Sequence, residues 1–201
     1  RWPKVLEPTC GKGNFIRGLL ESSHPPSEIV GIELQDRHIR VAQSIPSPKG
    51  TRVSVMKADL FRTDVGKDVK WRHSGPLLVI GNPPWVTNSG MGTVNGANLP
   101  RKSNFMGLAG IDAITGSSNF DIAEYIWIKL ISDLAGEDVT FALLCKTAVA
   151  RKVLSHLHRR NRPVSRAEIR RIDAGKWFGV SVDACLFVLK LSNGCRESTD
   201  S

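Results

Sequence analysis

A short apolar run at residues 77–80 stops at two consecutive prolines, and this break constrains the fold more than any other feature of the sequence. The run has the length and composition of a buried strand in a parallel sheet. Pro83 and Pro84 cannot donate hydrogen bonds to a neighbouring strand, so the strand has to end there. Asn82 precedes a proline and is held extended, and Trp85 follows at once. The sequence therefore predicts a stiff turn that presents an amide, carbonyl oxygens and an indole at the carboxyl end of a strand, where open α/β sheets bind ligands.

Other short apolar runs alternate with helical patterns along the chain. Strand-like runs lie at residues 5–6, 29–33, 53–55, 77–80, 139–145, 169–172 and 184–189. Helix-like spacing of apolar residues lies at 15–20, 39–45 and 120–131, and again after residue 147. This alternation is typical of strands joined by right-handed helical crossovers. We therefore expect an α/β fold with a doubly wound, mostly parallel, seven-stranded sheet and helices on both faces.

Three local details are expected within this pattern. Asp36 can cap the second helix, whose buried face would be Ile39, Val41, Ala42 and Ile45. Residues 62–75 are polar and show no clear helix. Residues 177–179 read as an aromatic turn between the last two strands.

The charge and the cysteines narrow the kinds of partner and environment. The chain has 201 residues, enough for one domain with a proper core, and a net charge of +9 with a pI near 9.7. This basic balance favours a polyanionic partner. No apolar stretch reaches the ~20 residues of a membrane span, and no signal peptide opens the chain. Since Cys10, Cys145, Cys185 and Cys195 form no CxxC pair, free thiols in a reducing cytoplasm are expected.

Residues 1–191 are interpreted as one domain, followed by a loose polar tail at 192–201. The first strand begins with almost no chain before it, so a fragment or trimmed form of a longer protein is expected. Residues 86–119 lack periodicity and are dominated by Gly, Asn and Ser, which indicates a long loop. Because this loop leaves the end of the 77–80 strand directly, we expect a lid or a substrate-contacting loop; an insertion without a role is the alternative.

Two earlier strand ends carry residues suited to a nucleotide-like ligand. The first strand leads into the turn Glu7-Pro8-Thr9-Cys10-Gly11-Lys12-Gly13-Asn14-Phe15, which opens a helix. Glycines let the backbone approach a ligand closely, and the helix start offers free N–H donors. Glu33 ends the second strand 20 residues beyond Gly13, about the spacing at which an acid meets ribose hydroxyls. A tight turn and a surface Glu that bind nothing are the alternatives.

Basic side chains gather between residues 151 and 171. They comprise Arg151, Lys152, His156, His158, Arg159, Arg160, Arg162, Arg166, Arg170 and Arg171. Such a run forms either a solvated face or a contact to phosphates, and the sequence favours neither. The two histidines are two residues apart and do not share a helix face, so a metal pair is not expected.

Four motifs occur in order at successive strand ends: E-P-T-C-G-K-G-N-F, G-I-E-L, K-A-D-L-F and G-N-P-P-W. Together they resemble the class I S-adenosylmethionine-dependent methyltransferases, specifically the amino-methylating DNA enzymes of the gamma order, of which the TaqI-type adenine-N6 enzymes are the nearest in pattern. The resemblance covers the chain from Val5 to about Leu191. Each motif alone is common, whereas the four in sequence are specific.

The resemblance implies a role for each motif. The catalytic residues would be Asn82, Pro83, Pro84 and Trp85, and Trp85 with Phe178 would stack on the target base. Asp121 matches a position beside this centre whose role the resemblance does not define. The S-adenosylmethionine cofactor would be bound by Glu7, Pro8, Thr9, Cys10, Gly11, Gly13, Phe15, Glu33, Leu34, Asp59 and Leu60. No metal is implied.

The implied chemistry explains these residue types. The exocyclic amine of adenine is a poor nucleophile because its lone pair is delocalised into the ring. The Asn82 side-chain oxygen and the Pro83 carbonyl would each accept one amine hydrogen, which localises the lone pair and aims it at the methyl group. The base must leave the duplex, at a cost of ~ a few kcal/mol that stacking would partly offset.

The partner implied is duplex DNA in a cytoplasmic restriction-modification or phage-defence system. The family also has an N-terminal cofactor-binding element and a target-recognition domain; neither is expected within these residues, so a recognition or nuclease domain or subunit would lie outside them. The alternatives are an RNA or protein-glutamine methyltransferase and a catalytically silent nucleic-acid-binding scaffold. The motifs do not separate adenine-N6 from cytosine-N4 methylation.

Overall fold

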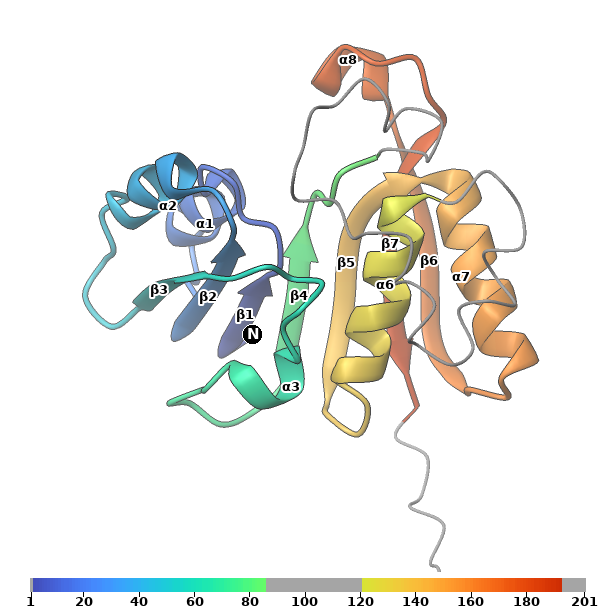
Figure 1. Cartoon of the computed structure of the whole chain (residues 1–201), viewed down its shortest axis with the longest axis horizontal. Coiled ribbons are helices and arrows are strands. Elements are labelled where there is room, and N and C mark those ends of the chain that lie inside the picture. The colour runs from blue at the N-terminus through green and yellow to red at the C-terminus, as the bar shows by residue number, and fades with distance from the viewer. Residues whose placement is uncertain (1, 86–120, 193–201) are drawn as a thin grey trace, which may run out of the picture.

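A sheet of seven strands forms the centre of the computed structural model, which describes residues 2–85 and 121–192 (Figure 1). The strands are β1 (Lys4–Glu7), β2 (Glu28–Glu33), β3 (Arg52–Lys57), β4 (Leu77–Gly81), β5 (Val139–Lys146), β6 (Val164–Ile172) and β7 (Ala184–Leu191). Their order is β3-β2-β1-β4-β5-β7-β6. β1 to β5 pair in parallel, whereas β7 is antiparallel to both β5 and β6. The predicted mostly parallel seven-stranded sheet is confirmed.

Helices cover both faces of this sheet. Those among the described residues are α1 (Asn14–Leu20), α2 (Asp36–Gln43), α3 (Val65–Asp68), α6 (Ile122–Asp133), α7 (Thr147–Arg159) and α8 (Ala174–Phe178). Neighbouring residues of a strand point to opposite faces. Val5 packs in one core cluster with residues of α1 and α2, and Leu6 packs in another with residues of α3, α6 and α7. The two helix groups therefore lie on opposite faces, as the doubly wound prediction requires.

Helix α6 lies in the centre of the larger cluster, which explains why its sequence is apolar on most sides. Trp127 is fully buried, and its ring centroid lies 4.7 Å from that of Phe187 in β7 and 5.9 Å from that of Phe141 in β5. Rings at these separations add attraction beyond the area they bury. The helix is thus fixed against the centre of the sheet.

The order of the strands reverses next to β1. The chain runs outward from β1 to β2 and β3, and β4 then returns to the opposite side of β1. In such sheets the carboxyl ends of the strands on either side of the reversal frame the ligand crevice. Here those ends carry Glu7 and Gly81.

Several predicted details are wrong. Asp36 is the first residue of α2 and not its cap, because Gln35 is the extended residue before it and the Asp36 carboxylate pairs with Lys57 at 2.7 Å. Val41 is exposed, since it falls on the solvent side of α2.

The lengths of three segments also differ from prediction. Residues 62–75 include the short helix α3, whose N-cap Asp64 accepts a hydrogen bond from the Lys67 backbone N–H. β6 begins at Val164 and not at Ile169. The prediction was too short because arginines interrupt the apolar pattern of this strand. The aromatic turn is the end of α8, which Gly179 closes with a φ of 68°. The expected lid at 86–119 and the end of the tail lie outside the described residues.

No helix within the described residues is long and apolar enough to cross a membrane. Cys10, Cys145 and Cys185 are free, as expected, and they are also buried; Cys195 lies outside the described residues.

Candidate active site

The turn after β1 is bound to the end of β2 by backbone hydrogen bonds. The Cys10 N–H donates to the Ile32 carbonyl at 2.9 Å, and the Gly11 N–H donates to Glu33 Oε2 at 2.9 Å. Within the turn, the Gly13 N–H donates to the Cys10 carbonyl at 2.8 Å. The first two motifs thus form one unit, although 22 positions separate Gly11 from Glu33.

Glycines make this close arrangement possible. Gly11 and Gly13 have φ values of 53° and 80°, in the left-handed region that disfavours other residues. A Cβ at Gly13 would lie 2.6 Å from Ile45 Cδ1 of the segment after α2, and one at Gly31 would lie 2.8 Å from Cys10 Sγ. Gly31 opens the G-I-E-L motif, but no role was predicted for it; its place inside an apolar strand is the signal, since a glycine there marks a close approach of another segment.

The Glu33 carboxylate holds the surrounding backbone in place through three hydrogen bonds. Its Oε1 accepts hydrogen bonds from the Leu34 N–H at 2.9 Å and the Gln35 N–H at 2.8 Å, in addition to the Gly11 bond at Oε2. Each carboxylate oxygen can accept two hydrogen bonds, and of these three bonds only that from Gly11 reaches Oε2, which leaves it a second acceptor position. The side chain is 11% exposed. Glu33 therefore holds the turn and still offers an acceptor toward the crevice.

Glu7 and Thr9 carry buried polar atoms that no described group satisfies. Glu7 Oε2 and Thr9 Oγ1 have no hydrogen-bond partner. Burial raises the pKa of Glu7 from its ordinary value near 4.5 to about 8; the Ile16 backbone hydrogen bond lowers it, and the charge of Glu33 raises it further. A buried acceptor without a donor is costly, and a cationic or hydrogen-bonding ligand would satisfy it.

Cys10 is a structural residue of the same turn. Burial, followed by the charges of Glu7 and Glu33, raises the pKa of its thiol to about 12. The thiol is therefore neutral and not a nucleophile at physiological pH. Of the other predicted cofactor-binding positions on this turn, Pro8 is buried and Phe15 is partly buried.

The third motif follows β3, next to the end of β2. The Ala58 N–H donates to the Glu33 carbonyl at 3.0 Å, which places Asp59 beside the Glu33–Leu34 segment. Asp59 Oδ1 accepts the Phe61 N–H at 3.0 Å, and its Oδ2 lies 3.6 Å from Arg62 Nε. Leu60 is buried, and Leu34 is partly buried. The structure thus brings Asp59, Leu60 and Glu33 together at one edge of the sheet.

The fourth motif leaves β4 next to the Glu7 turn. A Cβ at Gly81 would lie 3.5 Å from Glu7 Cγ, so the two strand ends are in close contact. Asn82 is exposed, and its side chain makes no hydrogen bond to another residue in the described parts of the chain. Pro83 is buried and Pro84 is exposed. The amide is therefore available to a ligand at the reversal of the strand order.

Trp85 is fixed by two contacts from other elements. Its Nε1–H donates to the Leu144 carbonyl of β5 at 3.3 Å, and its ring meets that of Phe178 of α8 edge to face, with centroids 5.4 Å apart. The structure therefore brings together the two aromatic residues that were assigned to the target base, Trp85 and Phe178. Because the rings touch at 74°, a base does not lie between them in this arrangement and would stack on one exposed face.

An ion pair joins the start of α6 to the end of β5, the strand that contacts Trp85 of the tetrapeptide at residues 82–85. Asp121 caps α6 through the Ala123 N–H at 3.0 Å, and its other oxygen pairs with Lys146 Nζ at 2.8 Å. The carboxylate is buried while the lysine is partly exposed. Asp121 was predicted to lie near this centre with an undefined role. Lys146 was not predicted, because its only signal in the sequence is its position at the end of a strand.

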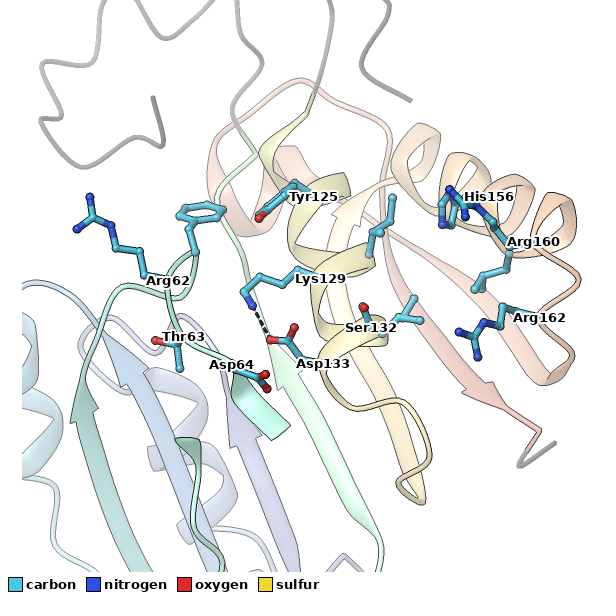
Figure 2. A pocket seen from close by; sticks show the side chains of 14 residues that line it. Arg62, Thr63, Asp64, Tyr125, Lys129, Ser132, Asp133, His156, Arg160 and Arg162 are labelled. Atoms are coloured by element: carbon cyan, nitrogen blue, oxygen red, sulfur yellow. Dashed lines mark hydrogen bonds and ion pairs between the residues drawn. The ribbon is translucent and has the colours of Figure 1, made fainter. Parts of the chain in front are cut away.

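A separate cavity of about 570 Å³ lies between the loop after β3, α6 and α7 (Figure 2). Part of its polar lining is internally paired: Lys129 Nζ lies 2.5 Å from Asp133 Oδ2, which also accepts the Val65 N–H at 3.0 Å. Glu7, Glu33 and Asn82 do not line it. This cavity is therefore distinct from the strand-end site. No cluster of His, Cys, Asp and Glu suited to a metal occurs among the described residues.

Comparison with known proteins gives one sequence relative and several structural ones. No family model matches the chain. The Type II methyltransferase M.NspV of Nostoc sp. is 38% identical over 187 residues, which are 92% of this chain and 39% of that protein. The chain thus spans about two fifths of the length of this relative.

Two solved structures share the fold. A putative class I S-adenosylmethionine-dependent methyltransferase from Listeria monocytogenes has a TM-score of 0.57 at 11% identity, covering 98% of this chain and 56% of that chain. The N-terminal domain of human METTL16, solved in complex with SAH, has a TM-score of 0.56 at 10% identity, covering 94% and 62%.

The sheet order and the four linked strand ends define the class I S-adenosylmethionine-dependent methyltransferase fold, as the predicted resemblance required. The chain is 38% identical to a Type II methyltransferase over most of its own length and shares the class I fold, and together these similarities imply S-adenosylmethionine as its cofactor.

Proposed function

We propose that this chain carries the catalytic centre of a DNA methyltransferase that transfers a methyl group to the N6 amine of an adenine flipped out of the duplex. One observation carries the proposal: the exposed Asn82 and the buried Pro83 directly follow Gly81 at the reversal of the strand order, where Gly81 meets the side chain of Glu7. The similarity to a Type II methyltransferase supports it.

The residues at the strand ends fit S-adenosylmethionine. The unsatisfied Glu7 Oε2 and Thr9 Oγ1 would meet its polar methionine part, the free acceptor of Glu33 would take a ribose hydroxyl, and the carboxylate of Asp59 would accept from the adenine amine. When bound, the cofactor supplies an electrophilic methyl group. A Cβ at Gly11 would meet nothing within 4 Å, so this glycine leaves open space beside the turn, whereas Gly13 lets the turn pack against Ile45.

Asn82 and Pro83 would activate the target nitrogen without a strong base. Each offers an oxygen that accepts one amine hydrogen, so the nitrogen becomes pyramidal and its lone pair is oriented. With its lone pair oriented in this way, the nitrogen would accept the methyl group that the cofactor supplies as the bond between that carbon and the cofactor's sulfur breaks, and it would then release a proton to water. Fixed prolines keep both acceptors in place, and such preorganisation is worth several kcal/mol at a water-poor site.

Trp85 and Phe178 would hold the flipped base. The hydrogen bond to Leu144 fixes the plane of Trp85, so one ring presents a face while the other presents an edge. Stacking on such a face recovers ~1–3 kcal/mol per base, which offsets part of the flipping cost.

DNA is the substrate favoured by charge and by similarity. The net charge of +9 suits a polyanion, and the relative is a Type II methyltransferase. Sequence choice would come from a recognition domain or subunit beyond this chain, and the cytoplasm is the expected location. The competing proposals are methylation of RNA, methylation of a protein glutamine, and a catalytically silent nucleic-acid-binding scaffold.

The test is to incubate the full-length protein with labelled S-adenosylmethionine and, separately, duplex DNA, RNA and protein. We expect label in duplex DNA and, after digestion to nucleosides, N6-methyladenine by mass spectrometry. N4-methylcytosine would correct the base, label in RNA or protein would replace the substrate, and no label with intact cofactor binding would favour a silent scaffold.

A further inference from the structure

An exposed aromatic side chain next to the proposed base site has no function in the mechanism above. Trp177 is 69% exposed, the largest value among the exposed large apolar residues of the described chain. It lies on α8, which stands above the end of the sheet where β6 finishes and the antiparallel β7 begins, the same end at which β4 and β5 finish (Figure 1). Phe178, Val180 and Val182 are exposed beside it in sequence. Contiguous exposed apolar groups of this kind mark binding surfaces more often than solitary ones do.

The segment that carries Trp177 is held by several hydrogen bonds. Asp173 Oδ1 accepts the Lys176 N–H at 2.9 Å, and the Val180 N–H donates back to the Ala174 carbonyl at 3.4 Å. The Asp183 carbonyl accepts the Thr147 N–H at 2.9 Å, which ties the segment to the start of α7. An aromatic ring on a braced support loses little conformational freedom on binding, so its contact area is used efficiently.

The surroundings of Trp177 favour a nucleic acid over an apolar partner. Lys176 Nζ lies 5.5 Å from the centre of the Trp177 ring, and Arg171 is exposed where β6 leads into α8, whereas the neighbouring Arg170 is paired with Glu168. Aromatic faces interleaved with cations match stacked bases linked by phosphates. The surface is also continuous with the base site, because the next residue, Phe178, contacts Trp85.

We propose that Trp177 is a second stacking residue, which packs on a base next to the flipped one while Phe178 and Trp85 face the target base. A flipped nucleotide leaves the faces of neighbouring bases exposed, and an aromatic ring adjacent to the target pocket can cover one of them. Lys176 would contact the phosphate beside that base. The inference rests on the proposed nucleic-acid substrate and goes beyond it by naming a contact outside the target pocket.

The test compares Trp177→Ala and Trp177→Phe with Val41→Ala in the full-length protein. Val41 is an exposed apolar residue of α2, remote from the tetrapeptide in the chain and on a different element, so it controls for the loss of an apolar surface group. For Trp177→Ala we expect duplex affinity and KM to worsen ~5- to 150-fold, the range for one lost stacked base, with cofactor affinity unchanged. Trp177→Phe should restore most of the loss, and Val41→Ala should match the wild type.

A spectroscopic measurement separates stacking from a general loss of DNA contact. Duplexes carrying 2-aminopurine beside the target adenine should show quenching by the wild type and by Trp177→Phe, and weaker quenching by Trp177→Ala at saturating protein. Equal quenching and equal KM in Trp177→Ala would overturn the inference, as would a change confined to self-association in sedimentation. If the wild type quenches 2-aminopurine through Trp177 but methylates no nucleic acid, the inference stands and the proposed reaction fails. If the wild type methylates DNA and Trp177→Ala behaves identically, the proposed reaction stands and the inference fails.

Discussion

Asn82 and Glu33 illustrate two ways in which a single side chain can serve this site. Asn82 is exposed and contributes no hydrogen bond to the described fold, whereas Glu33 accepts three backbone N–H groups. Removal of the first should therefore affect chemistry alone. Removal of the second should affect the shape of the cofactor turn as well as the contact to the cofactor.

We expect Asn82→Ala to abolish methyl transfer while cofactor affinity and melting temperature stay close to the wild type. Removal of one preorganised hydrogen-bonding group, measured for oxyanion-hole donors, costs ~10²- to 10³-fold in rate, and Asn82 also orients the attacking lone pair. Single-turnover transfer and calorimetric titration with S-adenosylmethionine measure the two quantities. Loss of binding with transfer retained per bound cofactor would show that the role assigned to Asn82 is wrong.

We expect Glu33→Ala to weaken cofactor binding by roughly 1–3 kcal/mol, the scale of a lost charged hydrogen bond. Glu33→Gln keeps one side-chain oxygen but places an NH₂ group against N–H donors, so it should also weaken binding. An unchanged dissociation constant in both variants would remove Glu33 from the cofactor site. Melting temperatures, read in parallel, report the loss of the turn's own hydrogen bonds.

At the scale of elements, the turn after β1 depends on the packing of β2 beneath it. Gly31 has no room for a Cβ, which would lie 2.8 Å from Cys10 Sγ and 3.2 Å from Ile16 Cδ1. Gly18 in α1 is the opposite case, since a Cβ there would meet nothing within 4 Å. The two glycines provide a matched pair.

Gly31→Ala should therefore destabilise the protein by ~1–3 kcal/mol through overpacking and weaken cofactor binding through displacement of the turn. Gly18→Ala should be neutral or stabilising by ~0.5–1 kcal/mol, because alanine favours a helix. Denaturant unfolding measures both changes. Adding Cys10→Ala should recover part of the Gly31→Ala loss in a double-mutant cycle; full additivity would locate the strain elsewhere.

The sequence predicted the sheet, its strand ends and the residues on them because each depends on a local signal. Short apolar runs, glycine turns and the proline stop are visible in one dimension. The position of Lys146 against Asp121 was not, because the pair forms only when β5 and α6 meet in the fold. Asp36 misled for a related reason: Lys57, on β3, provides a partner that competes with capping.

At the scale of the whole molecule, burial of Glu7 links the stability of the fold to its ligand. The Glu7 side chain lies at the end of β1 against Gly81, and burial raises the pKa of the carboxyl group to about 8. Between the unfolded and folded pKa values, the folded protein binds a proton that the unfolded chain has lost. Stability should thus be full below about pH 4.5 and fall as the pH rises toward 8, by as much as a few kcal/mol.

Glu7→Gln should remove this dependence, since the amide does not ionise. His156 acts in the opposite direction, because burial lowers its pKa and stability then increases as it loses its proton. The measurement is therefore the difference in unfolding free energy between wild type and Glu7→Gln from pH 5 to 8.5, in which the histidine contribution cancels. Saturating S-adenosylmethionine should flatten the wild-type curve if a cationic part of the cofactor meets the carboxylate, because that contact favours the ionised form. A wild-type curve parallel to that of Glu7→Gln without cofactor would show that Glu7 ionises normally in the folded protein, and it would remove the buried acid from the account of the cofactor site.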